Sequence, residues 1–278
     1  MSTLARSAAE PRARFRDLLA AEWIKLWSLR STPWACVITA LAVVGFNAGT
    51  AYDTYRYWPA DDPRHRAGFV RDGIALTHAF TANAALVLML AAAAIGAAAV
   101  VGEYSSGLIR TTFAAVPARR SVMAAKVAVV TAVTTVLGAV IAVASFVVTQ
   151  AILSGRGAGV PMSHPGAWRV LVASALLAPV CALTGMAIGT LARHMGITLV
   201  GAVALLLLLP LVFTDDRYWA AVVDHALPAG AWDRLVAVGY TPAAERWPST
   251  VAGAWTVDAV WLLAAAALTV AGVHRRDQ

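Results

Sequence analysis

The sequence predicts an all-α polytopic membrane protein with six transmembrane helices. Of its 278 residues, 60% are hydrophobic and only 13% are charged, whereas soluble domains contain about 25% charged residues. Several apolar runs also reach the roughly 20 residues with which a helix crosses the hydrocarbon core of a bilayer. A polar segment, 102–112, separates two of the longest runs and is expected to form a loop at the membrane surface.

Six apolar runs are predicted to be spans, and in chain order they cover 34–52, 74–101, 122–153, 168–192, 196–213 and 251–273. The first follows Ser31-Thr32-Pro33, a cap and a proline that suit a helix start. Pro179 lies near the middle of the fourth and predicts a kink there. We therefore divide the chain into an N-terminal segment, 1–33, a transmembrane domain, 34–273, and a tail, 274–278.

The segment before the first span, 14–30, is expected to form an amphipathic helix in the membrane interface. At about 100° per residue, one half of its surface carries Phe15, Leu18, Leu19, Trp23, Leu26 and Trp27, and the opposite face carries Arg14, Asp17, Lys25 and Ser28. Both tryptophans suit the level of the lipid headgroups, and Lys25 is then expected to face the cytosol. Such a helix either anchors the topology or also contacts a cytosolic partner.

The long connection before the last span, 214–250, alternates short apolar stretches with the breakers Pro228, Gly230, Pro242 and Pro248. It also carries three tryptophans, at 219, 232 and 247. This pattern favours short re-entrant helices that dip into the outer leaflet over a soluble loop.

The distribution of charge predicts the orientation. The termini and the loops after spans two and four carry thirteen bases and five acids, a net charge of +8, whereas the other three loops carry nine bases and ten acids, Asp258 included, a net charge of −1. Because basic residues are retained in the cytoplasm, both termini and the 102–121 segment are expected to be cytoplasmic. The bases flank spans and anchor them to anionic lipid, so we do not interpret them as a nucleic-acid site.

Small residues recur in the second and fourth spans, which contain Gly96 and the pair Gly185 and Gly189. Such residues let helices approach closely in lipid, and packing within the chain is favoured over a subunit interface. Cys36 and Cys181 lie in apolar runs, and the six histidines are far apart. The sequence therefore predicts no metal site and no catalytic residue.

Two motifs resemble the permease subunits of bacterial ABC transporters of the ABC-2 (type V exporter) class, and the resemblance extends over essentially the whole chain. The first is Glu22-Trp23-Ile24-Lys25-Leu26-Trp27-Ser28-Leu29-Arg30-Ser31. The second is Gly102-Glu103-Tyr104, then Gly107-Leu108-Ile109-Arg110-Thr111-Thr112, Pro117-Ala118-Arg119-Arg120 and Lys126. The closing Arg275-Arg276-Asp277 is a weaker similarity.

The resemblance assigns roles to these segments. It implies that the N-terminal amphipathic helix is a connecting helix, with Glu22, Trp23, Lys25, Trp27 and Arg30 as its motif residues. It also implies a cytoplasmic coupling helix after span two, which sits in a cleft of the ATPase. The residues assigned to this contact are Glu103, Tyr104, Gly107, Arg110, Thr111, Thr112, Pro117, Arg119 and Arg120. We expect Glu103 to accept a charge-assisted hydrogen bond from the partner or, alternatively, to pair with Arg110 inside the loop.

Function follows from the same resemblance. It implies a translocation subunit in the bacterial plasma membrane that exports a substrate, and drug, peptide, lipid and polysaccharide exporters share this architecture. The apolar spans, which carry no central charge, favour a hydrophobic or amphipathic substrate that is drug-, peptide- or lipid-like. The chain contains no Gly-x-x-x-x-Gly-Lys-[Ser/Thr] loop, so ATP and Mg²⁺ are expected on a separate ATPase subunit, present in two copies. Six spans are expected to form half of a pathway, completed by a second permease copy as a homodimer or a related heterodimer.

Two other classes of function stay open at this point. A membrane-embedded enzyme is one, although the sequence has neither Gly-x-Ser-x-Gly nor paired carboxylates. A non-transporting sensor or immunity subunit is the other, because it could share the same fold.

Overall fold

The computed structural model describes residues 14–58, 63–213, 217–239 and 246–272. Helices form most of this part of the chain, and it contains no strand. Six segments are long and apolar enough to cross a membrane, so the chain is a multi-pass membrane protein. They are α2 (Ser31–Arg56), α4 (Ile74–Thr77) with α5 (Ala82–Ser105), α7 (Arg119–Ser154), α8 (Ala167–Ala192), α9 (Met195–Val203) continued by the π-helix η1 (Ala204–Leu208) and α10 (Leu209–Val212), and α13 (Val251–Gly272).

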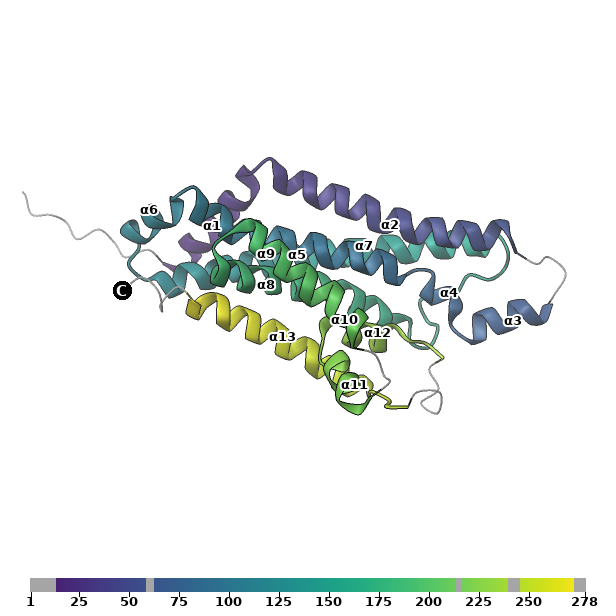
Figure 1. Ribbon diagram of the computed structural model, residues 1–278. Coiled ribbons are helices and arrows are strands. Elements are labelled where there is room, and N and C mark those ends of the chain that lie inside the picture. Colours follow the sequence, from purple (N-terminus) through teal and green to yellow (C-terminus); the bar gives the residue numbers. More distant parts are fainter. Residues whose placement is uncertain (1–13, 59–62, 214–216, 240–245, 273–278) are drawn as a thin grey trace, which may run out of the picture.

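Five further helices lie at the two ends of this bundle (Figure 1). At one end, here called the α6 end, α1 (Phe15–Ser28) and α6 (Leu108–Ala115) lie near the C-terminal ends of α5 and α13. Toward the other, here called the α3 end, lie α3 (Pro63–Arg71), α11 (Tyr218–His225) and α12 (Pro228–Val236). The chain therefore enters and leaves its spans at the same end of the bundle.

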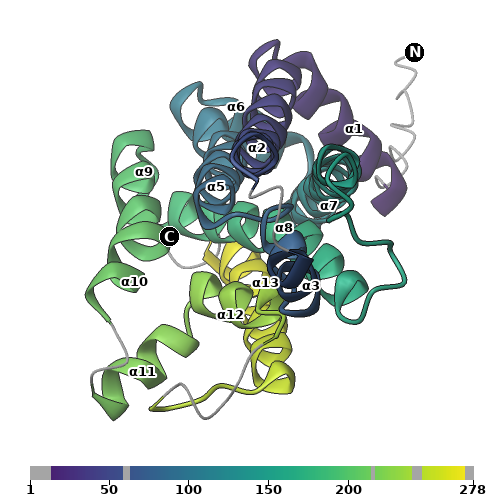
Figure 2. The same cartoon turned by 90° about the vertical axis from the view of Figure 1, so that its right-hand side faces the viewer.

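Helix α8 occupies the centre of the bundle, between α5 and α7 (Figure 2). Its apolar window is 83% buried, compared with 17% to 22% for α2, the α9–α10 segment and α13. Small residues allow this packing: a Cβ atom added at Gly96 would lie 1.9 Å from the carbonyl oxygen of Ala182, and one added at Gly185 would lie 2.1 Å from that of Ala93. The expectation that these glycines pack within the chain is confirmed.

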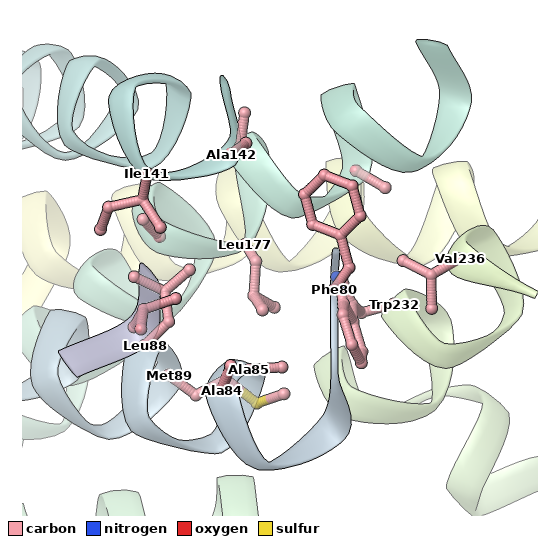
Figure 3. Packing of buried hydrophobic residues seen from close by; sticks show 14 of the residues in the cluster. Phe80, Ala84, Ala85, Leu88, Met89, Ile141, Ala142, Leu177, Trp232 and Val236 are labelled. Atoms are coloured by element: carbon pink, nitrogen blue, oxygen red, sulfur yellow. The ribbon is translucent and has the colours of Figure 1, made fainter. Parts of the chain in front are cut away.

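The core continues toward the α3 end, where α5, α7, α8 and α12 meet (Figure 3). Phe80 and Trp232 lie next to each other at this edge of the cluster. The indole of Trp232, which is only 3% exposed, donates a hydrogen bond of 3.2 Å to Ser174 Oγ of α8. A buried tryptophan usually has a hydrogen-bond partner for its indole N–H. Here that hydrogen bond fixes α12 against α8.

The second span is not continuous, contrary to the sequence prediction. Helix α4 ends at Thr77, and α5 begins at Ala82 with Thr81 as its N-cap, whose hydroxyl accepts a hydrogen bond of 3.3 Å from the Ala84 amide. Asn47 of α2 holds this break: its Oδ1 accepts from the Thr81 amide at 3.1 Å and the Thr81 hydroxyl at 2.9 Å. Threonine before an apolar run is a cap signal, and it decides the helix start here.

The expected cap of the first span was also wrong. Ser31 lies inside α2, and the N-cap position is Arg30, whose backbone is helical and whose side chain makes no capping hydrogen bond. Span 34–52 therefore begins earlier, almost directly after α1. The fourth span has the expected bounds to within one residue and keeps Pro179 inside it.

Short helices are present in the 214–250 connection, as expected from its breakers. Helix α12 is largely buried against α8 and α13, whereas Trp219 on α11 is 55% exposed. Their re-entry into a membrane stays a prediction. Residues 1–13, 214–216, 240–245 and the 274–278 tail lie outside the described residues, as do the bases Arg6, Arg12, Arg275 and Arg276 used in the charge count.

Candidate functional site

Four charged side chains from three helices meet at the α6 end. Lys126 of α7 donates hydrogen bonds to Glu22 Oε2 of α1 and, at 2.8 Å, to Glu103 Oε1 of α5. Lys25 of α1 donates to Glu22 Oε1 at 2.8 Å and lies 3.2 Å from Glu103 Oε1. We call these four residues the charge cluster.

The placement of the charge cluster follows from helical spacing. Leu18, Glu22 and Leu26 recur every fourth residue and form the buried stripe of α1. Leu18 packs against Val122 of α7, and Leu26 packs against Val129. Glu22 lies between the two leucines, so the packing of α1 on α7 delivers its carboxylate to Lys126.

The charge cluster is electrically neutral, and three of its four side chains are buried. Glu22, Glu103 and Lys126 are only 4%, 8% and 4% exposed. Buried charges of this kind are tolerated only when they are paired and hydrogen-bonded, since desolvation otherwise costs several kcal/mol per ion. Lys25 and Lys126 are also the only lysines of the chain, so both of its lysines serve this one cluster.

Lys25 links the charge cluster to α6. Its ammonium donates a hydrogen bond of 3.4 Å to Thr112 Oγ1, in addition to its contacts with the two glutamates. Burial lowers the pKa of Lys25, but the hydrogen bond to Glu22 and the charges of Glu103 and Glu22 outweigh this, so its pKa is raised above the ordinary value. The Lys25 side chain is 27% exposed, and its ammonium is held between α1, α5 and α6; the expectation that it faces the cytosol stays a prediction.

The polar segment after span two is mostly helical rather than a loop. Helix α5 extends through Ser105, and α6 begins at Leu108 after a turn at Gly107, whose positive φ of 73° favours glycine. Ile109 is buried, Thr112 is half-buried, and Arg110 and Thr111 are exposed. Helix α6 therefore presents a basic, hydroxyl-bearing face away from the bundle.

The remaining predicted residues of this segment lie beside α6, apart from Tyr104. Pro117 and Arg120 are exposed, and the Arg119 guanidinium lies 5.3 Å from the centre of the Phe113 ring. Tyr104 faces another way, toward the C-terminal end of α8, where the Arg193 guanidinium lies 4.9 Å from the Tyr104 ring centre. Tyr104 thus joins α5 to α8 rather than to α6.

The predicted apolar half of α1 divides into two stripes. Leu18 and Leu26 face α7, whereas Trp23 and Trp27 are 50% and 40% exposed on another side of the helix. Their ring centres are 5.7 Å apart, and Arg30 beyond them is exposed. The exposed parts of both tryptophans suit contact with lipid headgroups.

Pairing of Glu103 with Arg110 inside the loop does not occur, because Glu103 turns inward to the two lysines. Lys126 was recognised as part of the second motif but given no role, although it is central to the cluster. A lysine within an apolar helix needs an opposite charge nearby, and this signal, together with the rarity of lysine in the chain, could have identified it.

A cavity of about 220 Å³ lies beside the charge cluster, between α1, α5 and α7. Glu22, Lys25, Glu103 and Lys126 line its polar part. The remaining lining is mostly apolar and comes from Leu26, Leu29, Ala98, Ala99, Leu108, Val129 and Val130, together with Ser28, Gly102 and Ser106.

The sequence matches no protein-family model and no curated protein. Within the described part of the chain, no three side chains of the metal-ligating types gather closely enough to hold a metal ion.

Proposed function

We propose that this chain is the membrane-spanning permease subunit of an ABC transporter, coupled through α6 to a separate ATPase. The observation that carries the proposal is the connection of α6 to three long elements through the charge cluster. Thr112 of α6 contacts Lys25 of α1, Lys25 and Lys126 contact Glu103 of α5, and Lys126 belongs to α7. A force applied to α6 is thus transmitted to α1, α5 and α7 together.

The surface of α6 suits a protein partner. Arg110 and Thr111 are exposed at the end of the bundle, and no acidic residue lies between Glu103 and the end of α7. Arginine on such a surface pairs well with carboxylates of a partner, in bidentate geometry. In the proposed complex, this face lies in a cleft of the ATPase, both termini are in the bacterial cytoplasm, and two permease copies bind two ATPases.

The direction of transport follows from the resemblance described above, and the class of substrate from the apolar spans. We propose export of a hydrophobic or amphipathic compound, with ATP and Mg²⁺ bound by the ATPase and no cofactor in this chain. A non-transporting sensor would keep the same docking face but would not need a transport pathway. An embedded enzyme would need reactive groups in the bundle, and the charge cluster supplies none in which a nucleophile faces a base.

The proposal is tested by purifying the full chain from its own membrane in a mild detergent. Vanadate-sensitive ATP hydrolysis should copurify with the wild-type chain. Arg110→Glu should remove most of that activity from the purified sample, because it places a like charge against the carboxylates of the partner. Arg56→Glu reverses a similarly exposed charge at the opposite end and should leave the activity in place.

Two results would sink this assignment. One is a chain that purifies without any ATP-hydrolysing partner under conditions that preserve its helix content. The other is an equal loss of ATP hydrolysis in the Arg110 and Arg56 variants.

A further inference from the structure

The cavity beside the charge cluster is lined by hydrogen-bonding groups that have no partner among the described residues. Lys25 Nζ donates hydrogen bonds to Glu22 Oε1 and Thr112 Oγ1 and forms an ion pair with Glu103 Oε1, and both oxygens of Glu22 accept hydrogen bonds from lysines. Glu103 differs, since Oε1 contacts both lysines while no donor among the described residues reaches Oε2. Lys126 donates to two carboxylate oxygens, which leaves one of its three N–H bonds.

The unused groups are therefore one carboxylate oxygen and one ammonium N–H, on side chains that line the same cavity. A ligand that satisfies both must donate hydrogen bonds at one point and accept one at another. Its net charge should be near zero, because the charge cluster is already neutral and an added buried charge would be unpaired. A zwitterion with a primary ammonium and an anionic oxygen meets both conditions.

The rest of the cavity points to the source of such a zwitterion. Leu26, Ala99, Val129 and Val130 give its wall hydrocarbon character. The cavity lies beside the C-terminal end of α5 and the N-terminal end of α7. The exposed Trp23 and Trp27 on neighbouring α1 suit the headgroup level. A polar head with hydrocarbon attached, available at this depth, is a phospholipid of the bilayer.

We propose that this cavity binds the headgroup of an aminophospholipid. The primary ammonium of the lipid donates to Glu103 Oε2, and a phosphate oxygen accepts the remaining N–H bond of Lys126. The first part of an acyl chain lies along the apolar wall of the cavity. The bound lipid thereby contacts α1, α5 and α7, the three helices that the charge cluster joins.

Two lipids that differ in one chemical feature provide the test. Dioctanoyl phosphatidylethanolamine and dioctanoyl phosphatidylcholine share the phosphate and the net charge, but only the first has N–H donors. Native mass spectrometry of the delipidated full chain should show one bound phosphatidylethanolamine, held at least about tenfold more tightly than phosphatidylcholine, since charge-assisted hydrogen bonds are the strong ones. Glu103→Gln should remove that preference.

A second variant keeps the test decisive if Glu103→Gln impairs folding. Ala98 is exposed at the edge of the cavity, and Ala98→Trp should fill its entrance and abolish the binding of phosphatidylethanolamine. Ala114 is similarly exposed on α6 but does not line the cavity, so Ala114→Trp should bind as the wild type does.

Equal binding of the two lipids, tighter binding of anionic phosphatidylglycerol, or undiminished binding by the Ala98→Trp variant would each overturn the assignment. The measurement uses neither ATP nor an ATPase. Failure here would therefore leave the proposed permease function standing, and failure of that function would leave the lipid site standing.

Discussion

Removing the Lys126 ammonium should destabilise the protein more than any change at its exposed charges. Lys126→Met keeps the length of the side chain but leaves Glu22 and Glu103, 4% and 8% exposed, with Lys25 as their only cation among the described residues. Breaking a buried ion pair by removing one partner costs about 3–5 kcal/mol. Lys25→Met is the matched comparison, because the Lys25 side chain is 27% exposed and solvent screening limits its loss to about 1 kcal/mol.

The free energy of unfolding is measured by titrating the detergent-solubilised chain with sodium dodecyl sulfate and following helix content by circular dichroism. The double variant Glu22→Met, Lys126→Met retains one carboxylate, Glu103, and one ammonium, Lys25, in the cluster. This double variant should recover most of the free energy of unfolding that Lys126→Met loses. A neutral ion pair and an apolar replacement are both tolerated in a buried site, whereas an unpaired charge is not. A double variant no more stable than Lys126→Met, or a Lys126→Met that costs no more than Lys25→Met, would refute the assignment of a buried, mutually neutralised cluster.

Three further predictions concern packing, pH and topology. Gly185→Leu should lower the free energy of unfolding by several kcal/mol, because even a Cβ atom has no room there. Gly49→Ala should instead raise it by about 0.5–1 kcal/mol, because a Cβ atom added at Gly49 would have no atom within 4 Å. Equal effects of the two substitutions would contradict the packing of α5 on α8. The pKa of Lys25 is raised from 10.5 by its two glutamate partners. Its stabilisation should therefore be constant between about pH 6 and pH 9, where the ammonium and the carboxylates are charged, and be lost as the pH rises through the folded-state pKa of Lys25. A difference between wild type and Lys25→Met that fell between about pH 6 and pH 9 would refute this. In a cysteine-free background, Ser106→Cys should react with an impermeant maleimide only after cell lysis. Tyr57→Cys should react in intact cells, since Tyr57 is 75% exposed in the wild type. The reverse pattern would contradict the proposed orientation.

The spans could be predicted from sequence because length and hydrophobicity suffice to define them. The six expected runs correspond to the six segments that are long and apolar enough to cross a membrane. Small residues at 96 and 185 also indicated close helix contacts, and the structure places these glycines against α8 and α5 backbone atoms. These features depend on local composition, which the sequence displays directly.

Features that depend on a specific partner were harder to predict. The break before α5 depends on Thr81 meeting Asn47 of another helix, and an apolar run alone does not show it. The charge cluster joins residues 22, 103 and 126 through tertiary packing, so helical spacing could place Lys25 on a polar face but not reveal what that face contacts. The short helix α3 was not expected from the sequence.

Capture of the ATPase by α6 is the measurement that tests the proposed function most directly. A photo-crosslinking phenylalanine analogue replaces Thr111, which is exposed on α6, or Tyr57, which is exposed at the opposite end, and intact cells are irradiated. Mass spectrometry of the products should identify a P-loop ATPase attached at position 111 and none at position 57. An ATPase attached at position 57, or no ATPase at position 111 while the variant chain still inserts and folds, would contradict the account.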